Sequence, residues 1–483
     1  MPVRSHHDGL NLLNDPKLHY LANVIDAGKM AGHFNQHLHA SGLDSKWEVT
    51  HCAIERVYYR PTMHCGVLYR LTFRDPDGTK ADEWFFGRML PHGNEDVEFE
   101  KAAAAVRKNG TARNFLWTLL PVSFWRDLNM VLWIFPQDPK IPGLADVVDP
   151  AFVREHLEAN LETIGVPVPT PRNRGSSKTW RCTDIHYDRI KYMPGKRCVL
   201  RYKATLTGIA DQSREVTFYS KTYNDGMSKY HFEFLQNAHQ QLLAQNAAVN
   251  IPRPLLHFAG SNTSWHEEWK GASLISELEN SGFLDEKESF SRIATTLAAL
   301  HSSRISGLRR GPDVEEVLMT ASEDAAKLSC QLPQHHDLVT TILDHLTEAK
   351  NAVERQEIPR VPIHGACRLE QMLMRDTELA LVDFDALASG DPLFDIAEFV
   401  ASLQYLEFSH GGSRTALAKA QELLLESYAS AVKWPCDRRR LAWYVLAFLI
   451  SKVFASVKHL DIPALQKFEA KGEEVIYGWL EST

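Results

Sequence analysis

Asp383, whose carboxylate could bind a metal ion, follows the short apolar run Leu379–Val382. A run of this length predicts a buried strand, and the carboxylate at its end offers the kind of oxygen ligand that Mg²⁺ prefers. Because magnesium takes few protein carboxylates and keeps phosphate oxygens, the pattern indicates phosphate chemistry. An aspartate in this position is also common as a simple turn or helix cap. On this residue alone, both interpretations stay open.

A loop upstream of Asp383 carries further polar groups. One predicted strand ends at Ile363 and the next begins at Met372. Between them the chain reads His364-Gly365-Ala366-Cys367-Arg368-Leu369-Glu370-Gln371. Such a loop can place several polar side chains around one phosphate, and phosphoryl transfer depends on this positioning and on charge neutralisation. Downstream, Gly390-Asp391-Pro392 predicts a turn that starts a helix, with Asp395 in its first turn.

Taken in order, His364-Gly365, Gln371, Asp383 and Gly390-Asp391-Pro392 resemble the catalytic and metal loops of the aminoglycoside phosphotransferase and choline kinase family, a branch of the protein-kinase-like fold. In that family a His-Gly-Asp opens the catalytic loop, an Asn five residues after the Asp binds magnesium, and a strand delivers a second metal ligand. The resemblance implies an α+β fold, with an antiparallel small lobe and a mainly helical large lobe. It also implies ATP and Mg²⁺ as cofactors, a small-molecule hydroxyl as acceptor, and catalytic roles for His364 and Asp383.

The chain departs from the family pattern at two positions of the catalytic loop. Ala366 stands where the family has its catalytic aspartate, and Gln371 where it has the asparagine. Alanine cannot accept a proton, and a general base contributes about 10²–10⁴ in rate. Glutamine keeps an amide oxygen one methylene further out, so Gln371 and Asp383 are the expected metal ligands. Glu370 and Asp385 are neighbouring carboxylates that could substitute for the base, although solvated loop residues are the more ordinary interpretation of both.

Residues 181–269 have the pattern of the small lobe that the resemblance implies. Alternating apolar and polar residues predict three strands, at 188–193, 198–206 and 215–223. Lys221 then lies at the position of the family's phosphate-binding lysine. Glu233, in a predicted helix, lies where a glutamate would pair with that lysine. The alternative for these two residues is an ordinary surface ion pair, which contributes little.

The same resemblance implies the remaining nucleotide contacts. The turn between the first two strands holds Lys196 and Arg197, and it has a single glycine in place of a Gly-x-Gly-x-x-Gly loop. We therefore expect the side chains of Lys196 and Arg197 to meet phosphates, with a solvated basic hairpin as the alternative. Glu268, Trp269 and Lys270 form the expected hinge, where the adenine would hydrogen-bond to the backbone.

The first third of the chain repeats this small-lobe pattern at an ungapped shift of 133 positions. The coinciding pairs include Tyr59 and Tyr192, Pro61 and Pro194, Cys65 and Cys198, Tyr69 and Tyr202, Phe85 and Phe218, and Glu100 and Glu233. Arg88 falls where Lys221 falls, and no catalytic loop follows before the second copy begins. We therefore expect the first copy to lack a nucleotide site. Its aromatic strands, around 84–86 and 131–135, are expected to form a packing surface.

These patterns predict four segments: a module resembling a duplicated small lobe at 1–165, a linker at 166–180, the small lobe at 181–269, and a helical large lobe with the catalytic and metal loops at 270–483. Within the large lobe, helices are expected at 415–432, 438–458 and 463–480. Substrate is expected to sit against these helices, where acidic residues such as Glu398 and Glu407 could meet an amine. His301 is expected to be a buried, hydrogen-bonded histidine.

The composition is that of a globular protein without a nucleic-acid partner. The 483 residues are 44% hydrophobic and 24% charged, with a net charge of −8, whereas a nucleic-acid-binding domain is strongly basic. Seven cysteines without Cys-x-x-Cys spacing favour reduced thiols over a disulfide framework or a zinc site. The start of the chain lacks the apolar core of a signal peptide. The apolar run 441–450 is about half of a membrane span and predicts a core helix. We expect a cytoplasmic protein without a membrane partner.

Three functions are compatible with these residues. The first is an ATP-dependent small-molecule phosphotransferase that moves the γ-phosphate to a hydroxyl. The second is a catalytically impaired pseudokinase that serves as a nucleotide-binding or interaction module, for which a protein partner is expected. The third is a structural adaptor without a nucleotide site. The retention of Lys221, Glu233 and Asp383 together favours the phosphotransferase, because drift after loss of activity would erase some of them.

Overall fold

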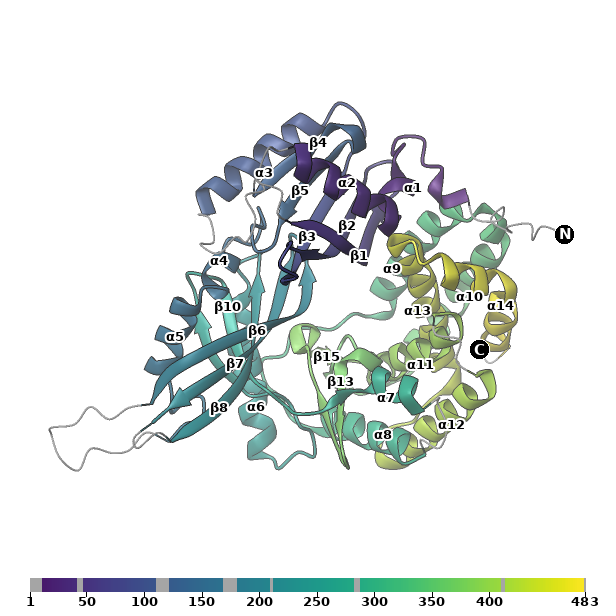
Figure 1. Cartoon of the computed structure of the whole chain (residues 1–483). Coiled ribbons are helices and arrows are strands. Elements are labelled where there is room, and N and C mark those ends of the chain that lie inside the picture. Colours follow the sequence, from purple (N-terminus) through teal and green to yellow (C-terminus); the bar gives the residue numbers. More distant parts are fainter. Residues whose placement is uncertain are drawn as a thin grey trace, which may run out of the picture. The chain divides into compact units, whose positions relative to one another are not determined.

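The structure, a computed structural model, describes residues 11–40, 47–109, 121–167, 180–208, 212–281, 287–409 and 413–481. The described residues form two compact units (Figure 1). The sheet unit consists of Leu13–Glu233 and Arg253–Glu268, and the helical unit consists of Met1–Leu12, Phe234–Pro252 and Trp269–Thr483. The predicted α+β fold, with antiparallel sheets and a mainly helical C-terminal part, is confirmed.

The sheet unit contains two five-stranded antiparallel sheets. The first, in the order β1-β2-β3-β5-β4, consists of β1 (Glu48–Arg60), β2 (His64–Arg74), β3 (Lys80–Met89), β5 (Met130–Ile134) and β4 (Val122–Trp125). The second, in the order β6-β7-β8-β10-β9, consists of β6 (Arg181–Met193), β7 (Arg197–Thr207), β8 (Ser213–Tyr223), β10 (Thr263–Glu267) and β9 (Pro254–Phe258). The helices of this unit are α1 (Leu21–Val24), α2 (Ala27–Ala40), α3 (Glu95–Asn109), α4 (Leu144–Val147) and α5 (Pro150–Ala159), and α6 (Ser228–Ala244) begins in it and continues in the helical unit.

The two sheets follow the register that relates their sequences. Adding 133 to the bounds of β1, β2 and β5 reproduces the bounds of β6, β7 and β10. The first strand of each sheet also has a bulge at the same place, where Thr50 and Thr183 are left out of the pairing. Their hydroxyl groups donate to the carbonyl oxygens of Thr72 and Thr205, at 3.1 and 3.2 Å. The repeat therefore extends to local backbone detail.

A second match precedes each sheet, at a shift of 123 positions. Residues 15–26 read Asp-Pro-Lys-Leu-His-Tyr-Leu-Ala-Asn-Val-Ile-Asp, and residues 138–149 read Asp-Pro-Lys-Ile-Pro-Gly-Leu-Ala-Asp-Val-Val-Asp. The second segment is separated from its sheet by ten more residues than the first segment is from its own. The ungapped register of 133 therefore does not align the two segments with each other. We define repeat 1 as residues 15–134 and repeat 2 as residues 138–267.

Equivalent hydrogen bonds tie each of these segments to its own sheet. The aspartate that opens it binds the hairpin of the first two strands, since Asp15 accepts from the Tyr59 hydroxyl at 2.9 Å and Asp138 accepts from the Tyr192 hydroxyl at 2.8 Å. A buried tyrosine of the second strand then donates to the helix, from Tyr69 to Val24 O at 2.7 Å and from Tyr202 to Val147 O at 2.6 Å. Residues 138–159 therefore pack with the second sheet, whereas the sequence analysis placed them in the first module. Most of the predicted linker, 168–179, lies outside the described residues.

The two repeats pack against each other through one face of the first sheet. Five aromatic and aliphatic side chains of this face share a buried core with residues of repeat 2. The five residues of the first sheet are Leu68, Trp84, Phe86, Val131 and Trp133. Trp133 Nε1 donates to the hydroxyl of Tyr192 at 3.2 Å, and the Tyr192 ring stacks on Trp84. The guanidinium of Arg189 lies 5.3 Å from the Trp84 ring centre and donates to Asp82 O at 2.7 Å. The expected aromatic packing surface of the first copy is thus observed.

The helical unit surrounds the predicted catalytic segment with helices. Its strands are β11 (Ala272–Ser273), β12 (Val361–Ile363), β13 (Met372–Arg375), β14 (Glu378–Leu381) and β15 (Ala388–Gly390), paired in the orders β11-β13-β14 and β12-β15. Its helices are α7 (Leu274–Ser281), α8 (Lys287–Ser302), α9 (Val314–Gln331), α10 (His336–Glu354), α11 (Pro392–Ser409), α12 (Arg414–Ala431), α13 (Arg438–His459) and α14 (Ile462–Leu480). The single 3-10 turns η5 (Leu369–Gln371) and η6 (Phe384–Ala386) flank the β13–β14 hairpin.

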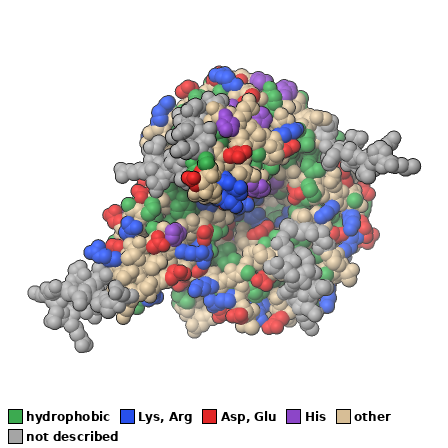
Figure 2. Space-filling model, in the orientation of Figure 1, with side chains coloured by type: hydrophobic (Ala, Val, Ile, Leu, Met, Phe, Trp, Pro, Cys, Tyr) green, Lys and Arg blue, Asp and Glu red, His purple; other side chains and the backbone are tan. Residues whose placement is uncertain are grey.

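Two helices, α11 and α13, form the core of the helical unit and are apolar along most of their length. By length and composition, α13 alone among the described helices could also cross a membrane, but 72% of its apolar stretch is buried inside the protein. This burial is what the prediction of a core helix requires. On the face shown in Figure 2, acidic and basic side chains are interspersed.

Candidate active site

The backbone of the catalytic loop is held by a carboxylate from α11. Asp395 has no exposed surface and accepts hydrogen bonds from His364 N at 2.6 Å and Gly365 N at 2.8 Å. His301 lies 3.1 Å from the same carboxylate through Nε2, and its Nδ1 lies 2.6 Å from the Tyr428 hydroxyl. A ring that donates Nε2–H to Asp395 accepts the tyrosine proton at Nδ1. His301 is therefore the buried, hydrogen-bonded histidine that was expected, and it orients Asp395.

The same loop is tied to the strand that carries Asp383. His364 Nε2 lies 2.9 Å from Val382 O, and its ring packs on Phe384. Gly365 has φ +75°, and a Cβ there would overlap the carbonyl oxygen of Ala386. The position requires glycine for both reasons. His364 thus acts as a positioning residue between the loop and the end of β14.

The two predicted metal ligands lie at one end of the β13–β14 hairpin. Met372 pairs with Leu381, and Val382 N donates to Gln371 O at 2.9 Å, so Gln371 and Asp383 come from neighbouring points of the two strands. The side-chain oxygen of Gln371 is buried and has no hydrogen-bond partner among the described residues. A buried amide oxygen without a donor is uncommon, and a cation would satisfy it. Two oxygen donors suit Mg²⁺, which completes its shell with phosphate and water.

Lys221 lies in the central strand of the second sheet. It pairs with Val199 on β7 and with Ser264 on β10, and its ammonium lies 5.4 Å from the ring centre of Tyr223. Because side chains alternate along a strand, Lys221 shares one face of the sheet with Thr217 and Tyr219. The strand therefore positions the lysine on a sheet face, as the resemblance implied.

Glu233, which the sequence analysis paired with Lys221, has a different partner. Its carboxylate lies 3.7 Å from Lys229 in the same helix, and its side chain is 61% exposed. In repeat 1, Arg88 occupies the position of Lys221, and its Nη1 lies 2.6 Å from Glu98 Oε1. In the register of 133, Glu98 falls on His231. Residues two apart on a helix do not face the same side, so the match of Glu100 with Glu233 selected the wrong helix position.

The turn of the second hairpin, with Lys196 and Arg197, is fixed by repeat 2 itself. Gly195 N donates to the buried Asp138 at 2.6 Å, and Asn224 N donates to Lys196 O at 3.0 Å. Burial raises the pKa of Asp138, and the hydrogen bond from Gly195 N opposes that rise. Lys196 is exposed at the tip of this fixed turn, where an anionic group could reach it.

The three residues of the expected hinge, Glu268, Trp269 and Lys270, differ in burial and in their contacts. The Glu268 carboxylate lies 2.6 Å from Arg201 Nη2 and is only 8% exposed, so its side chain is committed to Arg201 and only its backbone is open to an adenine. Arg201 pairs across the sheet with Tyr219, and both share the face of Lys221. The sheet unit ends at Glu268, and the helical unit resumes at Trp269, where Arg375 stacks on the indole at 5.0 Å. Lys270 is exposed.

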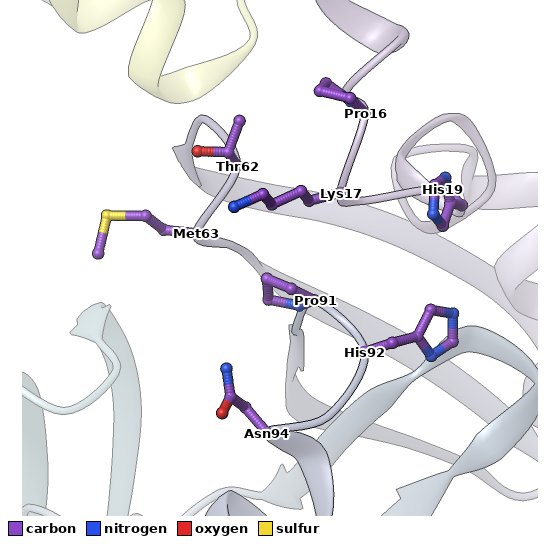
Figure 3. A pocket seen from close by; sticks show the side chains of 8 residues that line it. All are labelled: Pro16, Lys17, His19, Thr62, Met63, Pro91, His92 and Asn94. Carbon is purple, nitrogen blue, oxygen red and sulfur yellow. The ribbon is translucent and has the colours of Figure 1, made fainter.

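A pocket of about 520 Å³ lies in repeat 1 (Figure 3). Its lining comes from the opening segment, the β1–β2 turn and the loop before α3: Pro16, Lys17, His19, Thr62, Met63, Pro91, His92 and Asn94. In Figure 3 Lys17 extends toward Thr62 and Met63, with His19 and His92 at the other end. At the equivalent place in repeat 2, Asn224 takes the position of Pro91 and closes the turn with hydrogen bonds from both N and Nδ2.

One acidic residue lies beside the catalytic loop at a position that the sequence analysis did not predict. Glu398 follows Asp395 by three residues on α11, and its Oε1 lies 3.5 Å from Arg368 Nε. The spacing of the two carboxylates was the available signal, since residues three apart on a helix face one side. Of the other acidic candidates, Glu370 is exposed, and Glu407 is bound by Arg414 at 2.9 Å.

Comparisons with known proteins concern the family and the fold of the chain. Residues 211–431 match the model of a phosphotransferase enzyme family. This match confirms the predicted resemblance to a phosphotransferase family over these residues. No curated protein sequence matches the chain significantly.

Several solved structures are similar to parts of the chain. A choline kinase from Cryptosporidium parvum has 12% identity and a TM-score of 0.44, covering 69% of this chain and 98% of its own. A choline/ethanolamine kinase family protein from Mesorhizobium loti has 14% identity and a TM-score of 0.43, covering 68% and 98%. An aminoglycoside phosphotransferase from Streptomyces rimosus has 16% identity and a TM-score of 0.37, covering 55% and 92%.

Proposed function

We propose that this protein is an ATP-dependent phosphotransferase that moves the γ-phosphate of a magnesium-bound nucleotide to a hydroxyl group of a small molecule. The observation that carries the proposal is the metal end of the β13–β14 hairpin. There, the buried and unpartnered amide oxygen of Gln371 lies beside the strand that delivers Asp383. The family match over residues 211–431 supports the same conclusion.

Each site residue has a defined role in this proposal. Asp383 and Gln371 hold Mg²⁺, which neutralises charge on the transferred phosphate. Lys221 binds the phosphates, and Lys196 and Arg197 contact them from the hairpin turn. Asp395 and His364 act indirectly, because they fix the loop backbone and join it to the metal strand. Phosphoryl transfer depends mainly on such positioning and electrostatic stabilisation.

A second candidate function is a nucleotide-binding or interaction module without catalysis. Ala366 at the base position favours it, and so does the face around Lys221. Arg201, Tyr219 and Glu268 make this face polar, whereas ligand pockets are mostly apolar with few polar groups. A protein partner then becomes the expected ligand of the sheet unit.

Thermal unfolding with ATP, with and without Mg²⁺, tests the nucleotide site. At 100 times its dissociation constant, a ligand adds about 2.7 kcal/mol of stability. Lys221→Met should abolish the ATP-induced shift, and the matched variant Arg88→Met in repeat 1 should retain it. Equal effects of the two variants would contradict the assignment of the nucleotide to repeat 2. No shift in the wild type would leave the structural adaptor as the surviving hypothesis.

Transfer of labelled phosphate from ATP then separates the first two functions. The acceptors to test are choline, ethanolamine and an aminoglycoside, which are named by the similar structures, together with other sugars and amino alcohols. Labelled product supports the phosphotransferase. Nucleotide binding with no transfer to any acceptor or to water would support the binding module instead.

A further inference from the structure

Two carboxylates of α11 flank the position that lacks the catalytic aspartate. Asp395 accepts the N–H groups of His364 and Gly365, and one helical turn later Glu398 lies beside the N–H of Cys367, which stabilises its charged form. Ala366 lies between these anchored residues. The helix therefore binds the backbone of the catalytic loop on both sides of Ala366 in the sequence.

The two carboxylate oxygens of Glu398 differ in their hydrogen bonding. Its side chain is 13% exposed, and Oε1 faces Arg368. The second oxygen, Oε2, is buried and has no hydrogen-bond partner among the described residues. A buried carboxylate oxygen without a donor is costly, and an incoming hydroxyl group would supply that donor.

The charged groups around Glu398 come from three elements. Lys452 on α13 and Arg368 in the loop favour its ionised form, and Asp395 on its own helix opposes it. Burial is the largest influence and raises the pKa of Glu398 to about 7. Burial also lowers the pKa of Lys452 to about 8, and its ammonium donates to Ser402 Oγ at 2.8 Å. A carboxylate with a pKa near neutrality is suited to general base catalysis.

We infer that Glu398 is the general base of this protein and replaces the aspartate that is absent at Ala366. The inference rests on the proposed phosphotransferase function. In the step, the acceptor hydroxyl oxygen forms a bond to the γ-phosphorus while the bond from that phosphorus to the β–γ bridging oxygen breaks. The electron pair stays on the ADP oxygen. The hydroxyl proton passes to Glu398 Oε2 and then to solvent.

The decisive variant is Glu398→Gln, because glutamine keeps the shape and an acceptor oxygen for Cys367 but is not a base. We expect kcat for phosphate transfer to fall by about 10²-fold or more, while the thermal shift with MgATP stays unchanged. Glu370→Gln, which alters an exposed carboxylate of the same loop, should leave kcat unchanged. Adding Ala366→Asp to the Glu398→Gln variant should restore part of the lost rate, because a base returns to the loop.

The pH profile separates a base from a structural carboxylate. The wild-type rate should rise through the pKa of Glu398, since only the ionised form accepts a proton, and Glu398→Gln should lose this limb. Lys452→Met should move the limb to higher pH, because the ammonium charge lowers the pKa of Glu398. If Glu398→Gln does not fold, Glu398→Asp keeps a carboxylate and should retain transfer with a displaced limb.

Two outcomes would overturn the inference, and they differ from failure of the proposed function. Wild-type rate in Glu398→Gln would exclude Glu398 as the base and leave the phosphotransferase intact. Loss of both the rate and the MgATP shift in this variant would assign Glu398 a structural role. If the wild type binds MgATP but transfers phosphate neither to an acceptor nor to water, the phosphotransferase proposal fails, and the base role fails with it.

Discussion

Repeat 1 and repeat 2 share strand bounds, a bulge and an anchoring aspartate, but the corresponding faces of their sheets differ in chemistry. The face of repeat 1 consists of Leu68, Trp84, Phe86, Val131 and Trp133. In the register of 133, the same positions of repeat 2 hold Arg201, Thr217, Tyr219, Ser264 and His266. The backbone of the two sheets is thus equivalent, and the side chains decide which face packs against protein and which stays polar around Lys221.

This difference shows how one module can serve two purposes. The face that carries the strand cation is covered with aromatic side chains in repeat 1 and packs on the β6 hairpin of repeat 2. Arg88 at that face is neutralised by Glu98. A nucleotide site in repeat 1 would require this core to open. Repeat 1 therefore uses this face to pack against repeat 2, and four changes would test that comparison.

The largest effect is expected from Trp133→Ala. This indole is 7% exposed, packs on Phe86 and donates to Tyr192, so its removal leaves a cavity between the repeats. Large-to-small changes of a buried Trp cost about 3–5 kcal/mol. Denaturant unfolding followed by circular dichroism would measure the loss. His266→Ala, at the equivalent position of repeat 2, is the control and should cost much less. Similar losses would contradict the difference between the faces.

A smaller effect is expected from Glu98→Gln. The change leaves the charge of Arg88 without its counter-ion in a partly buried place, where Arg88 Nε already has no partner among the described residues. Loss of such a charged hydrogen bond costs about 1–2 kcal/mol after allowance for partial exposure. Glu100→Gln, on an exposed position two residues later, should have no effect on the midpoint of unfolding. A loss in Glu100→Gln alone would show that the pairing in repeat 1 is misassigned.

The pH dependence of stability should identify His64, which occupies the position of Arg197 in repeat 2. Burial, together with the charges of Arg88, Arg60 and Lys140, lowers the pKa of His64 to about 4. The folded protein therefore resists protonation that the unfolded chain accepts, so the stabilisation present above pH 6.5 is lost as pH falls toward 4. Thermal midpoints of wild type and His64→Gln should converge over this range. Parallel curves would contradict the shift.

The smallest effect is expected from Pro91→Asn, which copies the closure of repeat 2 into repeat 1. The new N–H and amide could donate to the β1–β2 turn as Asn224 does to Lys196 O and Gly195 O. A gain of about 0.5–1 kcal/mol is expected from the new hydrogen bonds. Hydrogen exchange of the turn amides at 62–64 would report it directly. Unchanged exchange would show that proline is not what keeps the pocket open.

Much of the secondary structure followed from local pattern. The strands expected at 198–206 and 215–223 lie within β7 (Arg197–Thr207) and β8 (Ser213–Tyr223), and the helix expected at 438–458 is α13 with one further residue. The first strand was underestimated, because β6 begins at Arg181 where its residues alternate less clearly. Alternation and helical periodicity reflect burial of one face, so they indicate elements reliably where one face is buried.

The contact partners of the candidate site residues were harder to predict than the strands and helices on which these residues lie. Asp383 and Gln371 were assigned together from the family resemblance, and the hairpin brings them to one end. Glu233 was assigned from a residue match, and it turned toward Lys229 instead. The difference has a geometric cause: strand pairing relates residues by a simple register, whereas the side of a helix that a residue occupies depends on how the helix packs against the sheet.

The amino-acid sequence by itself determined the module, its duplication and the loop that carries the site, because each of these is recorded in local residue types and in a constant spacing. The tertiary structure alone decided which carboxylates bind the backbone on either side of Ala366 and which face of each sheet is covered. Asp395 and Glu398 reach the catalytic loop across about thirty residues of chain only when α11 packs beneath it, since such contacts arise from burial of one element against another and not from the order of residues.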